Sequence, residues 1–295
     1  MTTHLDPHPD PLAGLSPPRP VRVAVSAFSR IVDVLVELGT QLRFYVRALL
    51  WLPRAAVRYW REVARLVAEI SFGSGALLVG GGTVAVIFAL SFFSGSELGL
   101  QGFKGLQIIG LAPLSGVISA YANTREIAPI VAGVGLAAQV GCGFTAQLGA
   151  MRISEEVDAL EVMAVPSLPY LVTTRILAAF TAVVPLYLVG LFASYVATEV
   201  EVVYLNHQSK GTYLYYFHRF LPVEELFYSL VKAVVFAIIV TLVHCYYGYT
   251  ATGGPEGVGR AAGRALRTSI VAIVIFDLVL TFVLYGANPS VRISG

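Results

Sequence analysis

Five long apolar segments dominate this chain and limit what it can fold into. They lie near residues 75–94, 107–149, 175–198, 226–250 and 267–287. A helix of about 20 apolar residues is long enough to cross the hydrocarbon core of a bilayer. Hydrophobic residues make up 56% of the chain and charged residues only 13%, about half of the ~25% that is typical of soluble domains. The segments therefore predict an all-α integral membrane protein.

The second segment, 107–149, is too long for one straight crossing. It contains Pro113 and Pro129 on either side of a polar patch at 123–126. Two crossings here would give six spans in total, and one kinked or partly re-entrant crossing would give five. The apolar pattern alone leaves both alternatives open.

The distribution of arginine favours five spans. The first 70 residues contain nine arginines, and positively charged segments stay in the cytoplasm. With five spans, the predicted loop 251–267, which carries Arg260, Arg264 and Arg267, is also cytoplasmic, whereas six spans would place it outside. We therefore expect a plasma (inner) membrane protein with a cytoplasmic N-terminus and an extracytoplasmic C-terminus.

The N-terminal region divides into a tail and an interfacial helix. Residues 1–24 are rich in proline and lack the basic and apolar regions of a signal peptide, which indicates a disordered cytoplasmic tail. Residues 25–72 follow a helical pattern in which six arginines form one stripe, if the helix continues through Pro53. Such a helix suits the surface of an anionic leaflet; the alternative is a solvated face of a cytosolic helix. The six are Arg43, Arg47, Arg54, Arg58, Arg61 and Arg65.

A charged stretch at 150–174 interrupts the apolar segments. Between 153 and 165, apolar and acidic residues alternate at helical spacing, Ser154 is a candidate N-cap, and Pro166 follows. The pattern predicts a short amphipathic helix at the cytoplasmic surface. Docking to a soluble partner is one interpretation, and a solvated acidic face is the other.

Four ionisable residues fall inside the predicted spans: Arg125, Glu126, Lys232 and Asp277. Each costs about 2.5–3.5 kcal/mol on insertion scales, so each is a candidate functional residue. If they face one cavity, Arg125 and Lys232 would attract an anionic lipid head group and Glu126 would limit the excess positive charge. The alternatives are a structural Arg125–Asp277 pair and a Lys232 that snorkels outward.

Several other classes of function lack support in the sequence. The chain has no phosphate-binding G-x-x-x-x-G-K-[ST] motif and no histidine or cysteine cluster for a metal. We therefore expect no cofactor in this chain and no catalytic set. A net charge of +2 argues against nucleic acid as a partner. His244, on an apolar face, is expected to be a buried structural histidine.

A resemblance to a known family rests on several motifs in a fixed order. The segment 124–165, TREIAPIVAGVGLAAQVGCGFTAQLGAMRISEEVDALEVMAV, resembles the signature of MlaE/YrbE-type permeases of MCE-associated ABC lipid transporters. The match extends to LGLQGFKGL at 98–106, SLVKAVVFAIIV at 229–240, YGYTATGGPEGVGRA at 247–261 and IFDLVLTFVLYG at 275–286. It covers nearly all of the chain after the tail.

The resemblance implies an interfacial helix followed by a five-span permease domain at 73–295, within which 153–165 is the coupling helix. It also implies a partner ATPase that binds ATP and Mg²⁺, MCE proteins outside the cytoplasm, and a lipid substrate bound at Arg125, Glu126 and Lys232, with Asp277 added as a further candidate. The residues that would contact the ATPase are Arg152, Glu155, Glu156, Asp158, Glu161 and Met163.

The chain departs from the family pattern at three places. Gln139 and Gln147 stand where the pattern has an arginine and a glutamate, and Pro166-Ser167 replaces an Asp-Pro pair. Actinobacterial (mycobacterial) Mce systems pair two different permeases, and these departures resemble the B-type YrbE member of such a heterodimer. They put a coupling role for the two glutamines in doubt.

Two further classes of function stay open at this point. A non-transporting membrane scaffold is one, but it would leave the ionisable residues inside the spans unexplained. A proton-coupled secondary transporter of an amphipathic substrate would use Glu126 and Asp277 as titrating groups. Such transporters often contain internal repeats, and we find no convincing repeat in this sequence.

Overall fold

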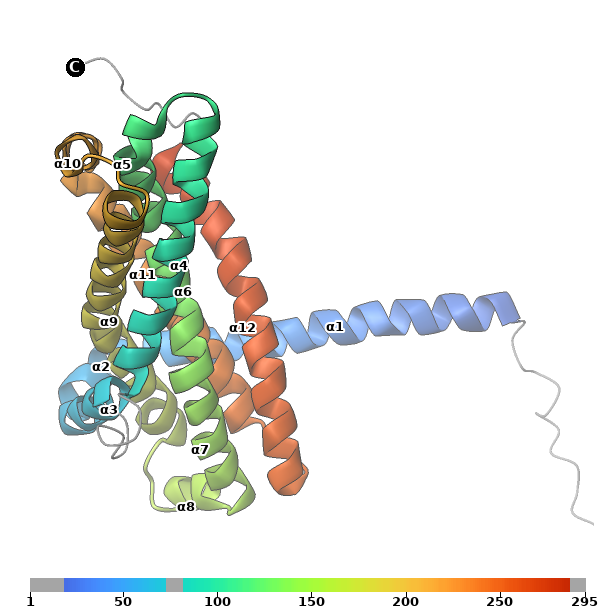
Figure 1. Cartoon of the computed structure of the whole chain (residues 1–295). Helices are drawn as coiled ribbons and strands as arrows, with labels where there is room; N and C mark the ends of the chain where they lie inside the picture. Colours follow the sequence, from blue (N-terminus) through green and yellow to red (C-terminus); the bar gives the residue numbers. More distant parts are fainter. Residues whose placement is uncertain (1–18, 73–81, 287–295) are drawn as a thin grey trace, which may run out of the picture. The chain divides into compact units, whose positions relative to one another are not determined.

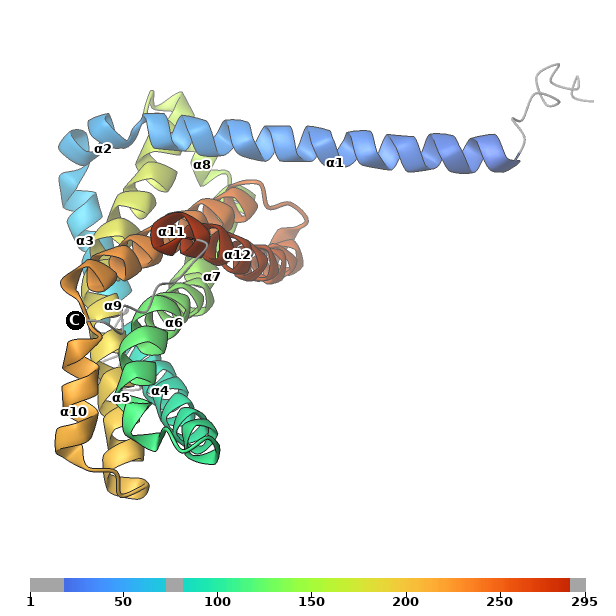
Figure 2. The ribbon, with the colours of Figure 1, turned by 90° about the horizontal axis from the view of Figure 1, so that it is seen from above.

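The computed structural model describes residues 19–72 and 82–286. Five of the described helical segments are long and apolar enough to cross a membrane, namely Gly82–Ile108, Ala112–Ile153, Pro169–Leu205, Val223–Tyr249 and Gly254–Tyr285. They run along one another in Figure 1 and are seen from above in Figure 2. The predicted all-α architecture with five spans is confirmed, although part of the first predicted span, 75–81, lies outside the described residues.

The N-terminal region is divided between two compact units, residues 1–46 and 47–295. Helix α1 (Arg19–Leu50) is followed by the short α2 (Leu52–Arg58) and by α3 (Trp60–Phe72). The first 18 residues of the predicted tail lie outside the described residues, but its last six are helical, because Pro20 falls in the first turn of α1, where proline is tolerated. The single arginine stripe is wrong, since the breaks at Trp51 and Tyr59 interrupt the helix phase.

The second span forms one continuous helical path with five changes of helix type. It begins with η2 (Ala112–Leu114) and α5 (Ser115–Ile118), and then passes through the π-helix η3 (Ser119–Ile127), α6 (Ala128–Leu136), the π-helix η4 (Ala137–Gly141) and α7 (Cys142–Ile153). Pro113 lies in the first turn of η2, where a proline needs no N–H bond. Pro129 follows the π-helix η3 without a break in the helical path, and the carbonyl oxygen of Arg125, four residues earlier, accepts a hydrogen bond from Lys232 instead. The segment therefore stays a single crossing.

Close packing of α4 (Gly82–Ile108) on α9 (Thr174–Glu199) depends on glycine. A methyl group added at Gly95 would lie 2.4 Å from the carbonyl oxygen of Ser194, and one added at Gly190 would lie 2.8 Å from Ser91 Oγ. Small residues let helix backbones approach closely in a bilayer, where no hydrophobic force between helices exists. The same third span contains the π-helices η5 (Pro169–Thr173) and η6 (Val200–Leu205) at its two ends.

The predicted loops are shorter than the sequence pattern indicates. The segment 199–225, between the third and fourth predicted spans, contains all of η6, the helix α10 (Lys210–Arg219) and the start of α11 (Val223–Tyr249). The segment 251–267 is mostly helical, because α12 (Gly254–Tyr285) begins after a turn in which Gly253 and Gly254 have φ angles of +87° and +68°. Glycine adopts this left-handed conformation without a steric cost. The three arginines predicted in a loop therefore lie on α12.

The predicted amphipathic helix is present but shorter than expected. Helix α8 (Glu156–Val162) follows α7 at the end of the bundle opposite to α5 and α10 (Figure 1). Ser154 is not its N-cap: the hydroxyl of Ser154 donates to the carbonyl oxygen of Ala150 at 2.9 Å and so closes the end of α7. The left-handed Glu155 then turns the chain into α8.

Candidate functional site

A buried charge cluster joins the second, fourth and fifth spans. At its centre, Lys232 on α11 is fully buried and its Nζ lies within 3.0 Å of four oxygen acceptors. These are the carbonyl oxygen of Arg125 at 2.6 Å, Glu126 Oε2 and Thr281 Oγ1 at 3.0 Å, and Asp277 Oδ1 at 2.7 Å. An ammonium group has only three N–H donors, so Lys232 has none left for a further ligand.

The second cation of the cluster, Arg125, is held by a carboxylate and two aromatic rings. Its Nε and Nη2 donate to the two carboxylate oxygens of Glu225, at 2.8 Å and 2.5 Å. Its Cζ lies 4.3 Å from the centre of the Tyr121 ring and 4.5 Å from that of Tyr285. Paired hydrogen bonds and stacking fix a guanidinium more tightly than a single contact does, so Arg125 is a fixed group.

Local structure places these residues side by side. Arg125 and Glu126 lie in the π-helix η3, a helix type that often occurs at functional sites. Lys232 follows Glu225 by seven residues and Thr281 follows Asp277 by four, so each pair lies on one face of its helix. The hydroxyl of Thr281 also donates to Glu126 Oε1 at 3.3 Å, which closes a ring of contacts around the ammonium group.

The cluster contains two cations and three carboxylates, so its formal charge is negative. The side chains of Arg125, Glu225 and Asp277 are 13–18% exposed, whereas that of Glu126 is 38% exposed. As it stands, the cluster presents a carboxylate to its surroundings rather than a free cation. An anion would have to displace Glu225 or Glu126 before it could contact either cation.

The structure thus brings together all four residues that the sequence predicted at membrane depth. The described residues form neither of the two structural alternatives considered for these charges. Arg125 pairs with Glu225 rather than with Asp277, and Lys232 is buried rather than snorkelling outward. Two partners were not predicted from the sequence: Glu225, which lies just before the predicted fourth segment 226–250, and Thr281, which carries no charge. Their spacing from Lys232 and Asp277 is the signal that would have found them.

The predicted docking segment is mostly exposed. Glu155 and Ala164, with φ angles of 61° and 58°, bracket α8, and Val157 is the only residue of α8 that is buried. At its other end, the side chains of Val162 and Met163 are 88% and 64% exposed. The segment therefore presents apolar and acidic groups together to its surroundings.

Hydrogen bonds fix this segment to the adjoining helices. Arg152 Nη1 lies 2.6 Å from Asp158 Oδ1, and Glu156 accepts a bond from Ser154 at 3.0 Å. Glu161 accepts a bond of 2.6 Å from the hydroxyl of Ser167. Of the six residues predicted to contact an ATPase, Glu155 and Met163 make no side-chain hydrogen bond or ion pair with the described residues.

Of the two glutamines singled out in the sequence, Gln147 connects three helices. Its amide nitrogen donates to Glu69 on α3 at 2.8 Å, and its oxygen accepts a bond from the buried Arg175 on α9 at 3.1 Å. On α3, the hydrogen bond from Arg65 holds the pKa of Glu62 below its ordinary value. Gln139 is exposed and has no such role among the described contacts.

The expectation for His244 is confirmed. Its ring is fully buried and contacts the hydroxyls of Thr145, at 2.8 Å, and Ser269, at 3.3 Å. Both ring nitrogens therefore have partners on neighbouring helices, and the described residues contain no group of three or more potential metal ligands.

Five apolar spans, three of them joined by buried ion pairs, define a multi-pass membrane protein, and comparison with known proteins identifies the class. A probable ABC transporter permease protein of Rickettsia bellii is 32% identical over 205 residues, which are 70% of this chain and 79% of the relative. A probable ABC transporter permease protein of Synechocystis is 29% identical over the same shares of the two chains. The Arabidopsis thaliana protein trigalactosyldiacylglycerol 1, chloroplastic, is 31% identical over 71% of this chain and 60% of its own length.

The family model described as Permease MlaE matches residues 72–283, and the chain belongs to this family of ABC transporter permeases. It is therefore a transport subunit. This class of permease implies a partner ATPase. The matched region contains both the buried charge cluster and the docking segment.

Proposed function

We propose that this chain is the transmembrane permease subunit of an ATP-driven lipid transporter. Family membership supports the transport role, and the name of the plant relative contains a lipid, trigalactosyldiacylglycerol. The substrate would be a fatty acid, phospholipid or sterol-type lipid. The partner ATPase would bind and hydrolyse ATP, and this chain would move the lipid.

The observation that carries this proposal is the exposed surface of the docking segment. Val162 and Met163 are adjacent, exposed apolar residues at the end of a short helix that also carries acidic side chains. Core apolar contacts with a polar rim are typical of protein interfaces. We infer that the ATPase binds here, on the cytoplasmic side of the inner membrane.

We further infer a role in lipid binding for Arg125, Glu126, Lys232 and Asp277. The half-exposed Glu126 would meet a head group first, and a phosphate would then compete with the carboxylates for the two cations. In this interpretation the cluster is a gated site, because its cations become available only when a carboxylate moves. Removing one partner of a buried ion pair destabilises the protein by several kcal/mol. A carboxylate of the cluster can therefore move away only if the lipid phosphate takes its place beside the cation.

The resemblance found in the sequence also supports partners for the complex. We propose that a second, paralogous permease completes the membrane part, with this chain as the B-type member of a YrbE pair in an actinobacterial Mce system. MCE proteins would bind on the extracytoplasmic side, near α10.

Charge reversal tests the docking assignment. In the double variant Glu156→Lys, Asp158→Lys, both carboxylates are exposed, so the variant should insert and fold but lose its attraction to a basic partner surface. We expect at least about a tenfold loss of ATPase recovered with the tagged chain, which corresponds to ~1.4 kcal/mol. The measurement is co-purification from membranes, followed by quantitation of each partner.

A matched control reverses Glu97 and Glu224, two exposed carboxylates on other helices. This variant should recover the ATPase normally. Equal ATPase recovery with both variants would contradict the docking assignment. In vesicles that contain the complex, vanadate should stop lipid transfer; arrest by loss of the proton gradient alone would instead support a proton-coupled transporter.

A further inference from the structure

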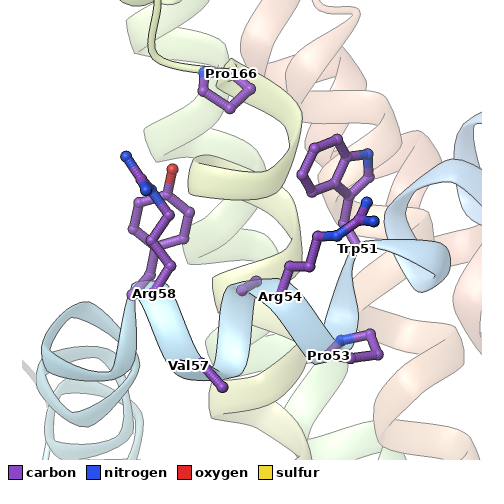
Figure 3. Close-up of a pocket in the computed structure, with 8 residues that line it drawn as sticks. Trp51, Pro53, Arg54, Val57, Arg58 and Pro166 are labelled. Atoms are coloured by element: carbon purple, nitrogen blue, oxygen red, sulfur yellow. The ribbon is translucent and has the colours of Figure 1, made fainter.

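A pocket beside α2 combines two exposed arginines with an apolar lining (Figure 3). Its volume is about 590 Å³, within the ~300–1,000 Å³ range of sites for small organic ligands. Helix α2, the residues at its two ends and one residue of the α8–α9 connection line it. The lining residues used below are Trp51, Arg54, Arg58, Tyr59 and Pro166.

The two arginines have no carboxylate partner among the described residues. Neither Arg54 nor Arg58 forms an ion pair within 4.0 Å there. Each instead lies near an aromatic ring, with Arg54 Cζ 5.4 Å from the centre of the Trp51 ring and Arg58 Cζ 5.9 Å from that of Tyr59. Because they are four residues apart, both extend from the same face of α2 (Figure 3).

The pocket is held in place by the permease domain. Ala55 of α2 is buried, Tyr59 packs edge-to-face on Tyr170 at 5.3 Å between ring centres, and Thr173 donates a hydrogen bond to the carbonyl oxygen of Ala48. Helix α2 is thereby fixed against the beginning of the third span. The arginines project from a fixed support, so the entropic cost of binding a ligand between them is reduced.

The pocket lies at the level of the membrane surface. Pro166 precedes the third span, Pro169–Leu205, by only three residues. Tryptophan, tyrosine and arginine are the residues expected at the level of lipid head groups. A ligand that matches this lining has an anionic group for two guanidiniums and an apolar part for the remaining surface.

We propose that this pocket binds one anionic phospholipid of the surrounding leaflet, with its phosphate between Arg54 and Arg58 and an acyl chain along the apolar lining. Guanidinium groups bind phosphate oxygens through paired, charge-assisted hydrogen bonds. A zwitterionic lipid places a second positive charge beside the two arginines and is disfavoured. The inference requires membrane insertion but not ATP-driven transport, so either proposal can fail without the other.

Trp51 provides a direct readout of pocket occupancy. The chain has two tryptophans, so Trp60→Phe leaves Trp51 as the sole indole fluorophore. This variant is reconstituted in phosphatidylcholine vesicles in which brominated phosphatidylglycerol or brominated phosphatidylcholine replaces a rising fraction of the lipid. We expect brominated phosphatidylglycerol to quench Trp51 half-maximally at about a tenfold lower lipid fraction than brominated phosphatidylcholine does. This difference corresponds to a binding preference of ~1.4 kcal/mol for the anionic lipid.

The arginines are tested in the same background. Arg54→Gln with Arg58→Gln should abolish the preference for the anionic lipid, whereas Arg264→Gln with Arg267→Gln, which removes the same charge from exposed sites on α12, should retain it. The reverse variant, Trp51→Phe, leaves the exposed Trp60 as a reference for general enrichment at the surface. Equal quenching of Trp51 by both lipids, or a preference that survives the loss of both arginines, would overturn the proposal.

Discussion

At the scale of single residues, Lys232 has the most demanding environment in the described part of the chain. Its ammonium group is fully buried, and it contacts two carboxylates, a hydroxyl and a backbone carbonyl from two other spans. Removing one member of a buried ion pair leaves its partners charged and without compensation, which costs more than the pair itself contributes. The ammonium group is therefore a structural link as well as part of the candidate site.

Lys232→Met is expected to destabilise the protein by about 3–5 kcal/mol, because it leaves Glu126 and Asp277 as two neighbouring carboxylates. Thermal unfolding of the purified protein in detergent measures the loss. Lys104→Met, at an exposed lysine, should change the unfolding temperature little. Adding Asp277→Asn to Lys232→Met should recover part of the lost stability, because it removes one of the two unpaired carboxylates. If stability does not recover, the unpaired carboxylates are not the cause of the destabilisation.

The charged members of the cluster could be predicted from the sequence, because ionisable residues are rare in apolar segments. Arg125, Glu126, Lys232 and Asp277 stand out for that reason alone. Their partners could not be ranked in the same way: Thr281 is an ordinary residue in a span, and Glu225 lies where the end of a span and a loop look alike. Pairing between helices depends on their rotation about their own axes, which hydropathy does not specify.

At the scale of helices, packing in this protein depends on a few contacts that admit no side chain. Gly95→Ala would place a methyl group 2.4 Å from the Ser194 carbonyl oxygen, so α4 and α9 would have to separate. Overpacking of this kind costs about 1–3 kcal/mol. The expected result is a lower unfolding temperature and weaker protection of α4 from proteolysis.

Gly105→Ala is the matched control on the same helix. Nothing lies within 4 Å of a methyl group added there, and alanine favours a helix over glycine by about 0.5–1 kcal/mol. This variant should be as stable as the parent or slightly more so. If both variants lose stability equally, the close α4–α9 contact at Gly95 is not the cause of the loss.

Helix boundaries were harder to predict than helix existence. The run GGPEGVGRAAG looks like a loop, yet α12 begins at Gly254, because the two positive-φ glycines complete the turn before it and the remaining glycines tolerate a helix. Likewise, Ser154 has the residue type of an N-cap, but its hydroxyl bonds back to Ala150. Residue type alone cannot distinguish the end of one helix from the start of the next.

At the scale of the whole molecule, the main prediction is orientation in the membrane. In a background without Cys142 and Cys245, single cysteines at Ser154 and Ser209 test both sides, since both serines are exposed and lie at opposite ends of the spans. An impermeant maleimide should label Ser209→Cys from outside intact cells, and should label Ser154→Cys only after permeabilisation. Labelling of Ser154→Cys in intact cells would reverse the proposed topology and remove the basis for ATPase docking.

The buried cluster also constrains how the chain is assembled during synthesis. The charged residues of the second span leave the ribosome first, those of the fourth follow, and Asp277 comes last. Each charge costs about 2.5–3.5 kcal/mol to insert alone, so the second and fourth spans gain stability when the later spans supply the partners of these charges. Insertion and tertiary folding are thus coupled in this protein, and a nascent chain cut short before the fifth span would leave Lys232 without one of its two carboxylates.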